Sequence, residues 1–128
     1  MKKILSGAAV LVAVAGTLLA GTAAPASADA VYNGAIALSP STGHYAYSTD
    51  YDSMPEAKAE AMRVCGFNDC RVVSWFSNGC GAIAYSSRAG LYTYGAAYSR
   101  TEAKNQALNK NRSGATIIHW SCTTGYQL

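Results

Sequence analysis

The side chains that could carry out catalysis are two histidines, His44 and His119, together with several serines and aspartates. Catalysis needs a nucleophile or a base that partner groups hold in position. No serine lies in a Gly-x-Ser-x-Gly turn of the kind that exposes a nucleophile. The enzyme hypothesis that remains is a small hydrolase that acts through one of the histidines on envelope or polymer substrates, and we treat it as the alternative. We expect a protein without catalytic residues.

The aspartates in the middle of the chain have structural explanations. Asp50 and Asp52 could form a carboxylate pair of the type that hydrolyses glycosidic bonds. Asp52, however, directly precedes Ser53 at a predicted helix start, where a negative charge is favourable. Asp69 lies beside Cys70, and we expect its side chain to close a turn rather than to bind calcium.

The four cysteines are Cys65, Cys70, Cys80 and Cys122. An even number of cysteines in an exported chain predicts two disulfides. Zinc is the alternative, with the two histidines as further ligands, but the sequence contains no Cys-x-x-Cys pair. We therefore expect no metal, no other cofactor and no thiol nucleophile.

Residues 1–28 have the organisation of a cleavable signal peptide. Lys2 and Lys3 form a positive start, an apolar run spans Ile4–Ala20, and Ala26-Ser27-Ala28 matches the cleavage pattern. The apolar run contains glycine and is not followed by a basic cluster, which argues against a stable membrane anchor. The protein is therefore predicted to be secreted.

The rest of the chain, residues 29–128, is nearly neutral. It carries eight Lys or Arg against seven Asp or Glu, without basic runs. Such a surface has no electrostatic footprint for nucleic acid or for an anionic membrane, so neither is an expected partner. The length corresponds to one domain with a single modest core.

Two parts of this domain repeat each other. Gly34-Ala-Ile-Ala-Leu-Ser39 recurs as Gly81-Ala-Ile-Ala-Tyr-Ser86. Further matches at a nearly constant offset pair Tyr45 with Tyr92, Tyr47 with Tyr94, Glu56-Ala57-Lys58 with Glu102-Ala103-Lys104, and Trp75 with Trp120. These matches indicate an internal duplication, with repeat one at about 32–79 and repeat two at about 80–122.

Each repeat is predicted to fold as strand, strand, helix and strand. In repeat one the strands are expected at 35–39, 44–51 and 71–76, where apolar runs and period-two alternation occur. The helices begin after Ser53 and Ser99, each followed three residues later by glutamate, which is the pattern of a capping box.

We expect both helices to pack on one face of a mainly antiparallel sheet, because their buried stripes are mostly alanine. Ala57, Ala61 and Val64 form the stripe of the first helix. Trp75 and Trp120 occupy the same place in the two repeats and are expected in the core.

The duplication selects one of the three disulfide pairings that four cysteines allow. Asn111 stands where repeat one has Cys65, and the position matching Cys70 is also without cysteine. Both cysteines are absent together, as expected if they bond to each other. This predicts the bonds Cys65–Cys70 and Cys80–Cys122.

Nine tyrosines are present, and six of them match across the repeats. Two interpretations remain open. The matched tyrosines pack across adjacent strands, where aromatic contacts add stability, or they form a partly exposed face that docks a protein or a glycan. In the second interpretation the binding residues are Tyr45, Tyr47, Tyr92 and Tyr94.

Five motifs extend over residues 32–122. They are Tyr32-x-Gly34-Ala-Ile-Ala, Cys65-Gly66-x-x-Asp69-Cys70-x-Val72, Cys80-Gly81-Ala82, Ser99-x-x-Glu102-Ala103 and Trp120-x-Cys122. In these motifs the chain resembles the secreted, mostly actinobacterial domain-of-unknown-function family 4189. The resemblance implies export and an actinobacterial origin. It implies no catalytic or binding residues, because the family has no agreed activity.

Taken together, the sequence predicts one duplicated α+β domain at residues 29–128, held by two disulfides. We expect it to be a secreted, non-enzymatic binding module. Its expected partner is an extracellular or cell-surface protein, which it engages as an inhibitor, adaptor or assembly component.

The exported protein is predicted to begin at Asp29, because Ala26 and Ala28 fit the small-residue requirement of signal peptidase. Intact mass spectrometry of the protein from culture supernatant measures this. A mass that still includes residues 1–28 would contradict the predicted cleavage.

Overall fold

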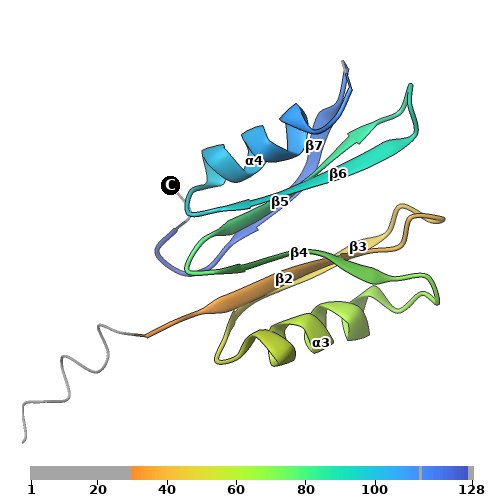
Figure 1. Ribbon diagram of the computed structural model, residues 1–128. Helices are drawn as coiled ribbons and strands as arrows, with labels where there is room; N and C mark the ends of the chain where they lie inside the picture. The colour runs from red at the N-terminus through yellow and green to blue at the C-terminus, as the bar shows by residue number, and fades with distance from the viewer. Residues whose placement is uncertain (1–29, 113, 127–128) are drawn as a thin grey trace, which may run out of the picture. The chain divides into compact units, whose positions relative to one another are not determined.

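Two runs of strand, strand, helix and strand follow each other along the chain (Figure 1). Repeat one contains β2 (Asn33–Leu38), β3 (Tyr45–Tyr51), α3 (Met54–Cys65) and β4 (Arg71–Ser77). Repeat two contains β5 (Cys80–Ser86), β6 (Leu91–Ala97), α4 (Arg100–Asn109) and β7 (Thr116–Cys122). The predicted α+β class and the order of elements in each repeat are confirmed.

These elements come from a computed structural model that describes residues 30–112 and 114–126. The predicted signal peptide and its cleavage site lie outside the described residues.

The expectation of one sheet with both helices on the same face is wrong. The strands form two antiparallel three-stranded sheets, in the orders β3-β2-β4 and β6-β5-β7. Each helix lies on the outer face of its own sheet, and the inner faces of the two sheets meet, giving four layers (Figure 1). The physical reason is that each repeat completes a sheet of its own but leaves one apolar face, which only the other repeat covers.

Small side chains join each helix to its sheet. Ala35 and Ala37 of β2 are fully buried against Ala57 and Ala61 of α3, and repeat two uses alanines in the same way. Val64, expected in this stripe, is exposed, and Cys65 is buried instead.

The two predicted serine residues cap the N-termini of the helices. The Ser53 hydroxyl accepts a hydrogen bond from the Glu56 amide, and the Ser99 hydroxyl accepts one from the Glu102 amide. The serines therefore satisfy amides that have no partner within the helix.

The inner faces of the sheets meet around Ile36, Phe76 and Ile83, all of them buried. The Phe76 ring lies against Gly34 and Gly81, the first residues of the repeated Gly-Ala-Ile-Ala motif, and a Cβ atom at either glycine would clash with it. These two glycines are therefore required for the close approach of the sheets.

Both predicted disulfides are present. Cys65–Cys70 closes the turn between α3 and β4, and Cys80–Cys122 joins residues that lie opposite each other on β5 and β7. The second bond ties the last strand to the start of repeat two. Two disulfides in a chain of this size are typical of proteins that function in an oxidising compartment.

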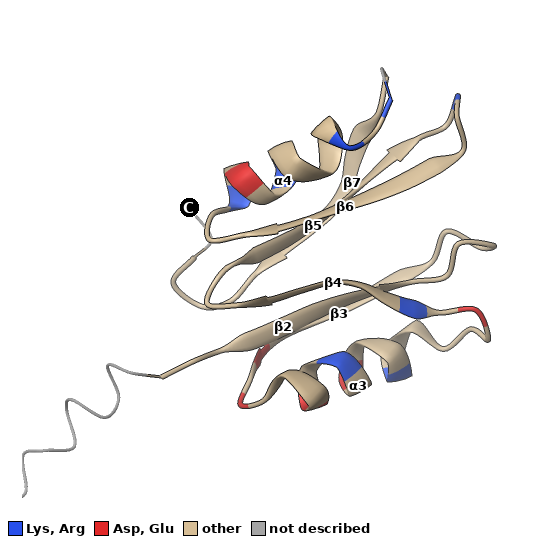
Figure 2. Cartoon of the chain, viewed as in Figure 1, with Lys and Arg blue, Asp and Glu red and all other residues tan. Residues whose placement is uncertain are grey.

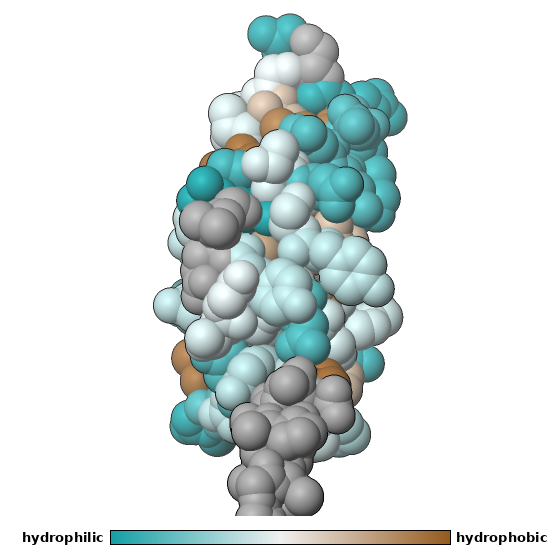
Figure 3. All heavy atoms as spheres, turned by 90° about the vertical axis from the view of Figure 1, so that its left-hand side faces the viewer, coloured by the Kyte–Doolittle hydropathy of each residue, from teal (hydrophilic) through white to brown (hydrophobic). Residues whose placement is uncertain are grey.

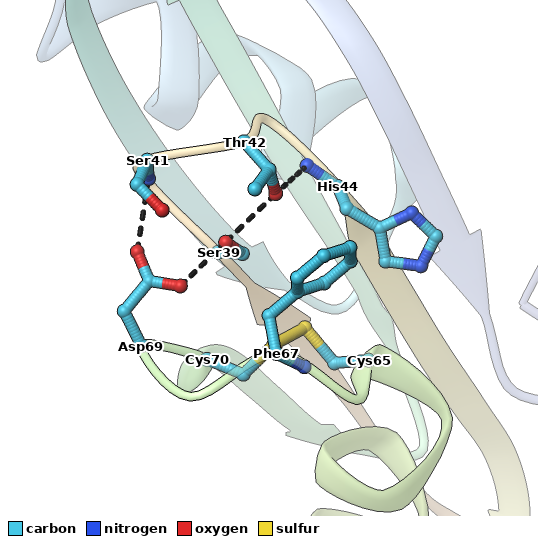
Figure 4. The surroundings of a disulfide bond; sticks show 8 residues. All are labelled: Ser39, Ser41, Thr42, His44, Cys65, Phe67, Asp69 and Cys70. Carbon is cyan, nitrogen blue, oxygen red and sulfur yellow. Dashed lines mark hydrogen bonds between the residues drawn. A yellow bond between two sulfur atoms is a disulfide. The ribbon is translucent and has the colours of Figure 1, made fainter.

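Asp69 links two turns (Figure 4). One is the turn closed by the Cys65–Cys70 disulfide, and the other is the turn between β2 and β3. The Asp69 carboxylate accepts hydrogen bonds from Ser39 Oγ at 2.5 Å and from the Ser41 amide at 2.9 Å. Beside this contact the His44 ring lies 5.3 Å from the Phe67 ring. The aspartate thus stabilises a turn, as predicted, although the turn belongs to a neighbouring hairpin.

The hydrogen bonds from Ser39 and Ser41 lower the pKa of Asp69 to about 2. In the unfolded chain the carboxyl titrates near its ordinary value of 3.8, so the unfolded state takes up a proton first as the pH falls. Stability contributed by this carboxylate is complete above about pH 4 and is lost between about pH 4 and 2.

We therefore expect Asp69→Asn to be less stable than the wild type at pH 6 and to lose less stability between pH 4 and 2. Urea unfolding followed by tryptophan fluorescence measures both effects. Asn68→Ala is the matched control, because Asn68 is exposed in the same turn and does not titrate; this variant should keep the wild-type pH dependence. Parallel curves for wild type and Asp69→Asn would contradict this role of Asp69.

Candidate functional site

The two histidines lie in different parts of the fold. His44 is exposed in the turn before β3, whereas His119 lies in β7 with part of its ring buried. Within residues 30–112 and 114–126, neither ring forms a hydrogen bond with a serine, an aspartate or a glutamate. The geometry therefore brings together no nucleophile–base pair around either histidine in this part of the chain.

His119 is held between two tyrosines of the other sheet. Its ring centroid lies 4.7 Å from that of Tyr45 and 4.7 Å from that of Tyr47. The Nε2 atom is buried without a hydrogen-bond partner among the described residues, and burial lowers the pKa of the imidazole. The ring is thus kept neutral as a packing element between β3 and β7.

Asp50 and Asp52 do not form the carboxylate pair that was considered from the sequence. Asp50 accepts hydrogen bonds from the Thr124 amide at 2.8 Å and from Thr124 Oγ1 at 2.5 Å. It therefore ties the turn after β7 to repeat one. Asp52 lies directly before Ser53, the N-cap of α3.

The four tyrosines proposed as binding residues divide between two edges of the fold. Tyr45, Tyr92 and Tyr94 pack against the buried cluster between the sheets, while Tyr47 is 51% exposed. Tyr45 and Tyr47 lie on edge strand β3, and Tyr92 and Tyr94 lie on edge strand β6. Arg71 donates a hydrogen bond to the Tyr94 hydroxyl at 3.3 Å.

A groove runs between the edge strands β4 and β6, which contact each other across the two sheets. Its walls are Val73, Ser74 and Trp75 from β4, and Tyr94, Gly95 and Ala96 from β6. Lys110, directly after α4, completes the wall. The volume of the groove is about 320 Å³. We call this feature the β4–β6 groove. A second hollow, which shares Trp75 and Ala96, continues it towards Tyr98.

Two large aromatic side chains are exposed along the β4–β6 groove. Trp75 is 50% exposed and Tyr98 is 76% exposed. The expectation that Trp75 belongs to the core is therefore wrong. Trp75 lies on edge strand β4, where the long side chain of Lys58 from α3 lies over its ring and leaves half of it exposed. Trp120 packs against the core of repeat two and is partly buried.

A lysine lies over each tryptophan ring. Lys58 Nζ is 4.3 Å from the ring centroid of Trp75, and Lys104 Nζ is 5.9 Å from that of Trp120, which Arg100 also covers. The two lysines occupy matching places in the repeated Glu-Ala-Lys sequence. The sequence thus contained a signal for this pairing, but not for the exposure of Trp75.

The described residues offer little support for metal binding or for a membrane-spanning helix. Residues 30–112 and 114–126 contain no cluster of three His, Cys, Asp or Glu that could hold a metal ion. No helix in these residues is long and apolar enough to cross a membrane. On the face seen in Figure 3, hydrophobic residues outside the grey atoms occur separately rather than as one patch.

Comparison with known proteins identifies the family of this chain. Residues 33–122 match the family described as "Domain of unknown function (DUF4189)". The chain belongs to this family. Relatives of this chain include the protein Rv1269c of Mycobacterium tuberculosis and the protein Mb1300c of Mycobacterium bovis. Each is 41% identical over 97 residues, which is 76% of this chain and 73% of the relative.

A solved structure has a similar fold. The NMR structure of Rv1813c from Mycobacterium tuberculosis has a TM-score of 0.60 and 33% sequence identity, over 71% of this chain and 74% of that one. The DUF4189 assignment and these mycobacterial relatives confirm the resemblance that the five sequence motifs carried.

The unpartnered, partly buried position of His119 predicts a pH dependence of stability. Its pKa in the folded protein lies below the ordinary value of 6.5, so the unfolded state binds a proton first as the pH falls. Stability is therefore complete above about pH 6.5 and decreases below it.

We expect His119→Gln to lower the dependence of the unfolding free energy on pH between 7 and 5, as measured by urea unfolding. His44→Gln is the matched control: His44 is exposed beside Phe67, so this variant should keep the wild-type slope. If His119→Gln and the wild type lose stability equally over this range, the burial of the imidazole has no energetic consequence.

Proposed function

We propose that this DUF4189 protein is a secreted, non-enzymatic binding module that engages an extracellular or cell-surface protein through the β4–β6 groove. One observation carries the proposal: Trp75 and Tyr98 are exposed at a groove between two strand edges. Buried aromatic anchors commonly dominate the energy of protein–protein interfaces, because they bury a large area with few rotatable bonds.

The surroundings of the groove support the same function. Edge strands present backbone donors and acceptors that a partner can use. The two disulfides and the packing of the sheets make the groove walls rigid, which lowers the entropic cost of binding. Tyr94, one of the four tyrosines selected from the sequence, forms part of the wall. Tyr45 and Tyr47 lie on the other pair of edges, which provides a comparison within the same molecule.

The first test is capture of partners from the culture supernatant of the producing bacterium, with the tagged, disulfide-bonded protein as bait. Trp75→Ala and Tyr98→Ala should each lower recovery of the specific partner by at least about tenfold, with an unchanged melting temperature, if they are binding hot spots. Tyr47→Ala, on the opposite edge, should recover the partner as the wild type does.

Other outcomes would redirect the proposal. Loss of the partner with Tyr47→Ala but not with Trp75→Ala would place the interface at β3 and β7. Recovery of a glycan in place of a protein would change the class of partner. Hydrolysis of peptidoglycan, peptide or polysaccharide by the purified protein, abolished by His44→Ala or His119→Ala, would overturn the binding function in favour of the hydrolase.

A further inference from the structure

The turn that follows the first strand is built alike in the two repeats. Ser39 directly follows β2 and Ser86 ends β5, and both serines are buried. The carbonyl of each serine accepts a hydrogen bond from the amide of a glycine four residues later, Gly43 or Gly90, and both glycines have a positive φ. Each turn therefore has a serine hydroxyl and the amide two residues later in matching places.

In repeat one an internal carboxylate binds these two groups (Figure 4). The Ser39 hydroxyl donates a hydrogen bond to one carboxylate oxygen of Asp69, and the Ser41 amide donates one to the other oxygen. Asp69 lies two residues before Arg71, which pairs with Leu38 of β2. Repeat one thus supplies its own ligand to the turn.

Repeat two has a glycine in place of this aspartate. Thr116 of β7 pairs with Tyr85 of β5, as the two matching residues of repeat one pair with each other. The residue two positions before Thr116 is Gly114, which therefore matches Asp69. Repeat two has no side chain at this position that could reach the turn.

The donors of the second turn are kept, but they have no acceptor among the described residues. The Ser86 hydroxyl accepts a hydrogen bond from the Ala89 amide at 3.2 Å and donates none to a residue that the structure describes. The Arg88 amide, which matches that of Ser41, is likewise not hydrogen-bonded within residues 30–112 and 114–126. The two groups that bind the carboxylate in repeat one are thus available in repeat two.

Two arginines lie beside these donors. A hollow of about 420 Å³ is lined by Ser86, Arg88, Ala89 and Arg112. Neither guanidinium forms a salt bridge with a carboxylate in the part of the chain that the structure describes. A guanidinium group can donate two parallel hydrogen bonds to one carboxylate, which makes arginine a preferred residue for binding this group.

Asn111 holds the turn that carries Arg112. It stands at the position of Cys65, and its side-chain amide donates hydrogen bonds to the Leu91 carbonyl at 3.0 Å and to Thr93 Oγ1 at 2.8 Å. The turn after α4 is therefore fastened to β6 without a disulfide. This contact keeps Arg112 close to the β5–β6 turn.

The charge of repeat two also favours an anion. Residues 80–122 contain five Lys or Arg and one Glu, whereas residues 32–79 contain three Lys or Arg and five Asp or Glu. Figure 2 shows basic residues in the β5–β6 turn and after α4, and acidic residues in neither place. A positive field at the hollow attracts a negatively charged ligand.

We infer that the hollow between the β5–β6 turn and the α4–β7 turn binds an external carboxylate, as repeat one binds the carboxylate of Asp69. The Ser86 hydroxyl and the Arg88 amide each donate to one carboxylate oxygen, and the guanidinium groups of Arg88 and Arg112 neutralise its charge. This site goes beyond the proposed binding function. It shares no lining residue with the β4–β6 groove, so each can fail without the other.

The probe is N-acetyl-aspartate N-methylamide, titrated into the ¹⁵N-labelled, disulfide-bonded protein and followed by amide NMR shifts. We expect saturable shifts at residues 86–89 and 112 and none at residues 39–42, where Asp69 already occupies the turn. Binding should weaken as salt is added, because salt screens the attraction between the charges. N-acetyl-asparagine N-methylamide is neutral and has the same shape, and it should bind at least about tenfold more weakly.

Acetate distinguishes the source of the carboxylate. Tighter binding of the blocked aspartate than of acetate supports an acidic side chain of another polypeptide as the ligand. Equal binding of the two supports a free carboxylate at the same site.

Arg88→Gln and Arg112→Gln should each weaken binding of the blocked aspartate by at least about threefold with an unchanged melting temperature, because each removes one charged donor. Arg100→Gln is the matched control. It removes the same charge from the same repeat but lies at the other end of α4 from Arg112, so it should bind as the wild type does.

Gly114→Asp supplies the carboxylate from the protein itself. A Cβ atom at Gly114 would meet no atom within 4 Å, and aspartate and asparagine tolerate the positive φ of this residue better than most residues do. Gly114→Asp should therefore bind the blocked aspartate at least about threefold more weakly than Gly114→Asn, which has the same backbone requirement without the charge. If these variants do not fold, the two arginine variants decide.

The inference is overturned if the asparagine compound binds as tightly as the aspartate compound, or if no saturable shift occurs at millimolar concentrations. Shifts centred on residues outside the two turns also overturn it, as does wild-type binding by both arginine variants. Tighter binding of inorganic phosphate than of the blocked aspartate would overturn the assignment to a carboxylate.

Discussion

The packing of Phe76 against Gly34 and Gly81 is the contact on which the rest of the arrangement depends. Because neither glycine has a side chain, the two sheets approach until the ring of one touches the backbone of both central strands. This approach brings β4 beside β6 and β3 beside β7, so the edges of the sheets meet in pairs. The groove on one side and the contact of His119 with the tyrosines on the other are both consequences of it.

The duplication gives two copies of the same backbone, and the differences between the copies give the molecule its two unlike edges. Repeat one alone has the disulfide between Cys65 and Cys70 and the Asp69 carboxylate that joins two turns. Repeat two alone has the side chains that cover the edge of β6. A twofold arrangement of identical repeats would have two equal edges. Here His119 packs against two tyrosines on one side, and on the other side the buried Ser74 donates a hydrogen bond to the Gly95 carbonyl.

Rigidity is built into both sides of the groove. The Ser74 hydroxyl links β4 to the Gly95 carbonyl of β6, and Cys80–Cys122 ties repeat two together. Asp50 joins repeat one to the turn after β7 through Thr124. In the proposed binding function, a groove held in this way would not need to be ordered on binding, and the ordering cost would fall mainly on the partner. This suits a small domain whose surface has little net charge to steer association.

The sequence by itself determined the strands, through their alternation, and the helices, through Ser53 and Ser99, because these features depend on local patterns. Comparison of its two repeats also determined the disulfides, through the joint absence of two cysteines from repeat two. It also led to the family. The tertiary structure alone decided that the repeats form two sheets. Whether the strands of two repeats pair in one sheet or stack as two depends on contacts between segments far apart in the chain. For the same reason the tertiary structure alone decided that Trp75 is exposed, that Ser74 bonds to the neighbouring sheet and that His119 packs against two tyrosines. The exposure of a side chain on an edge strand depends on the layer that packs beside it, and a local sequence pattern does not predict that layer.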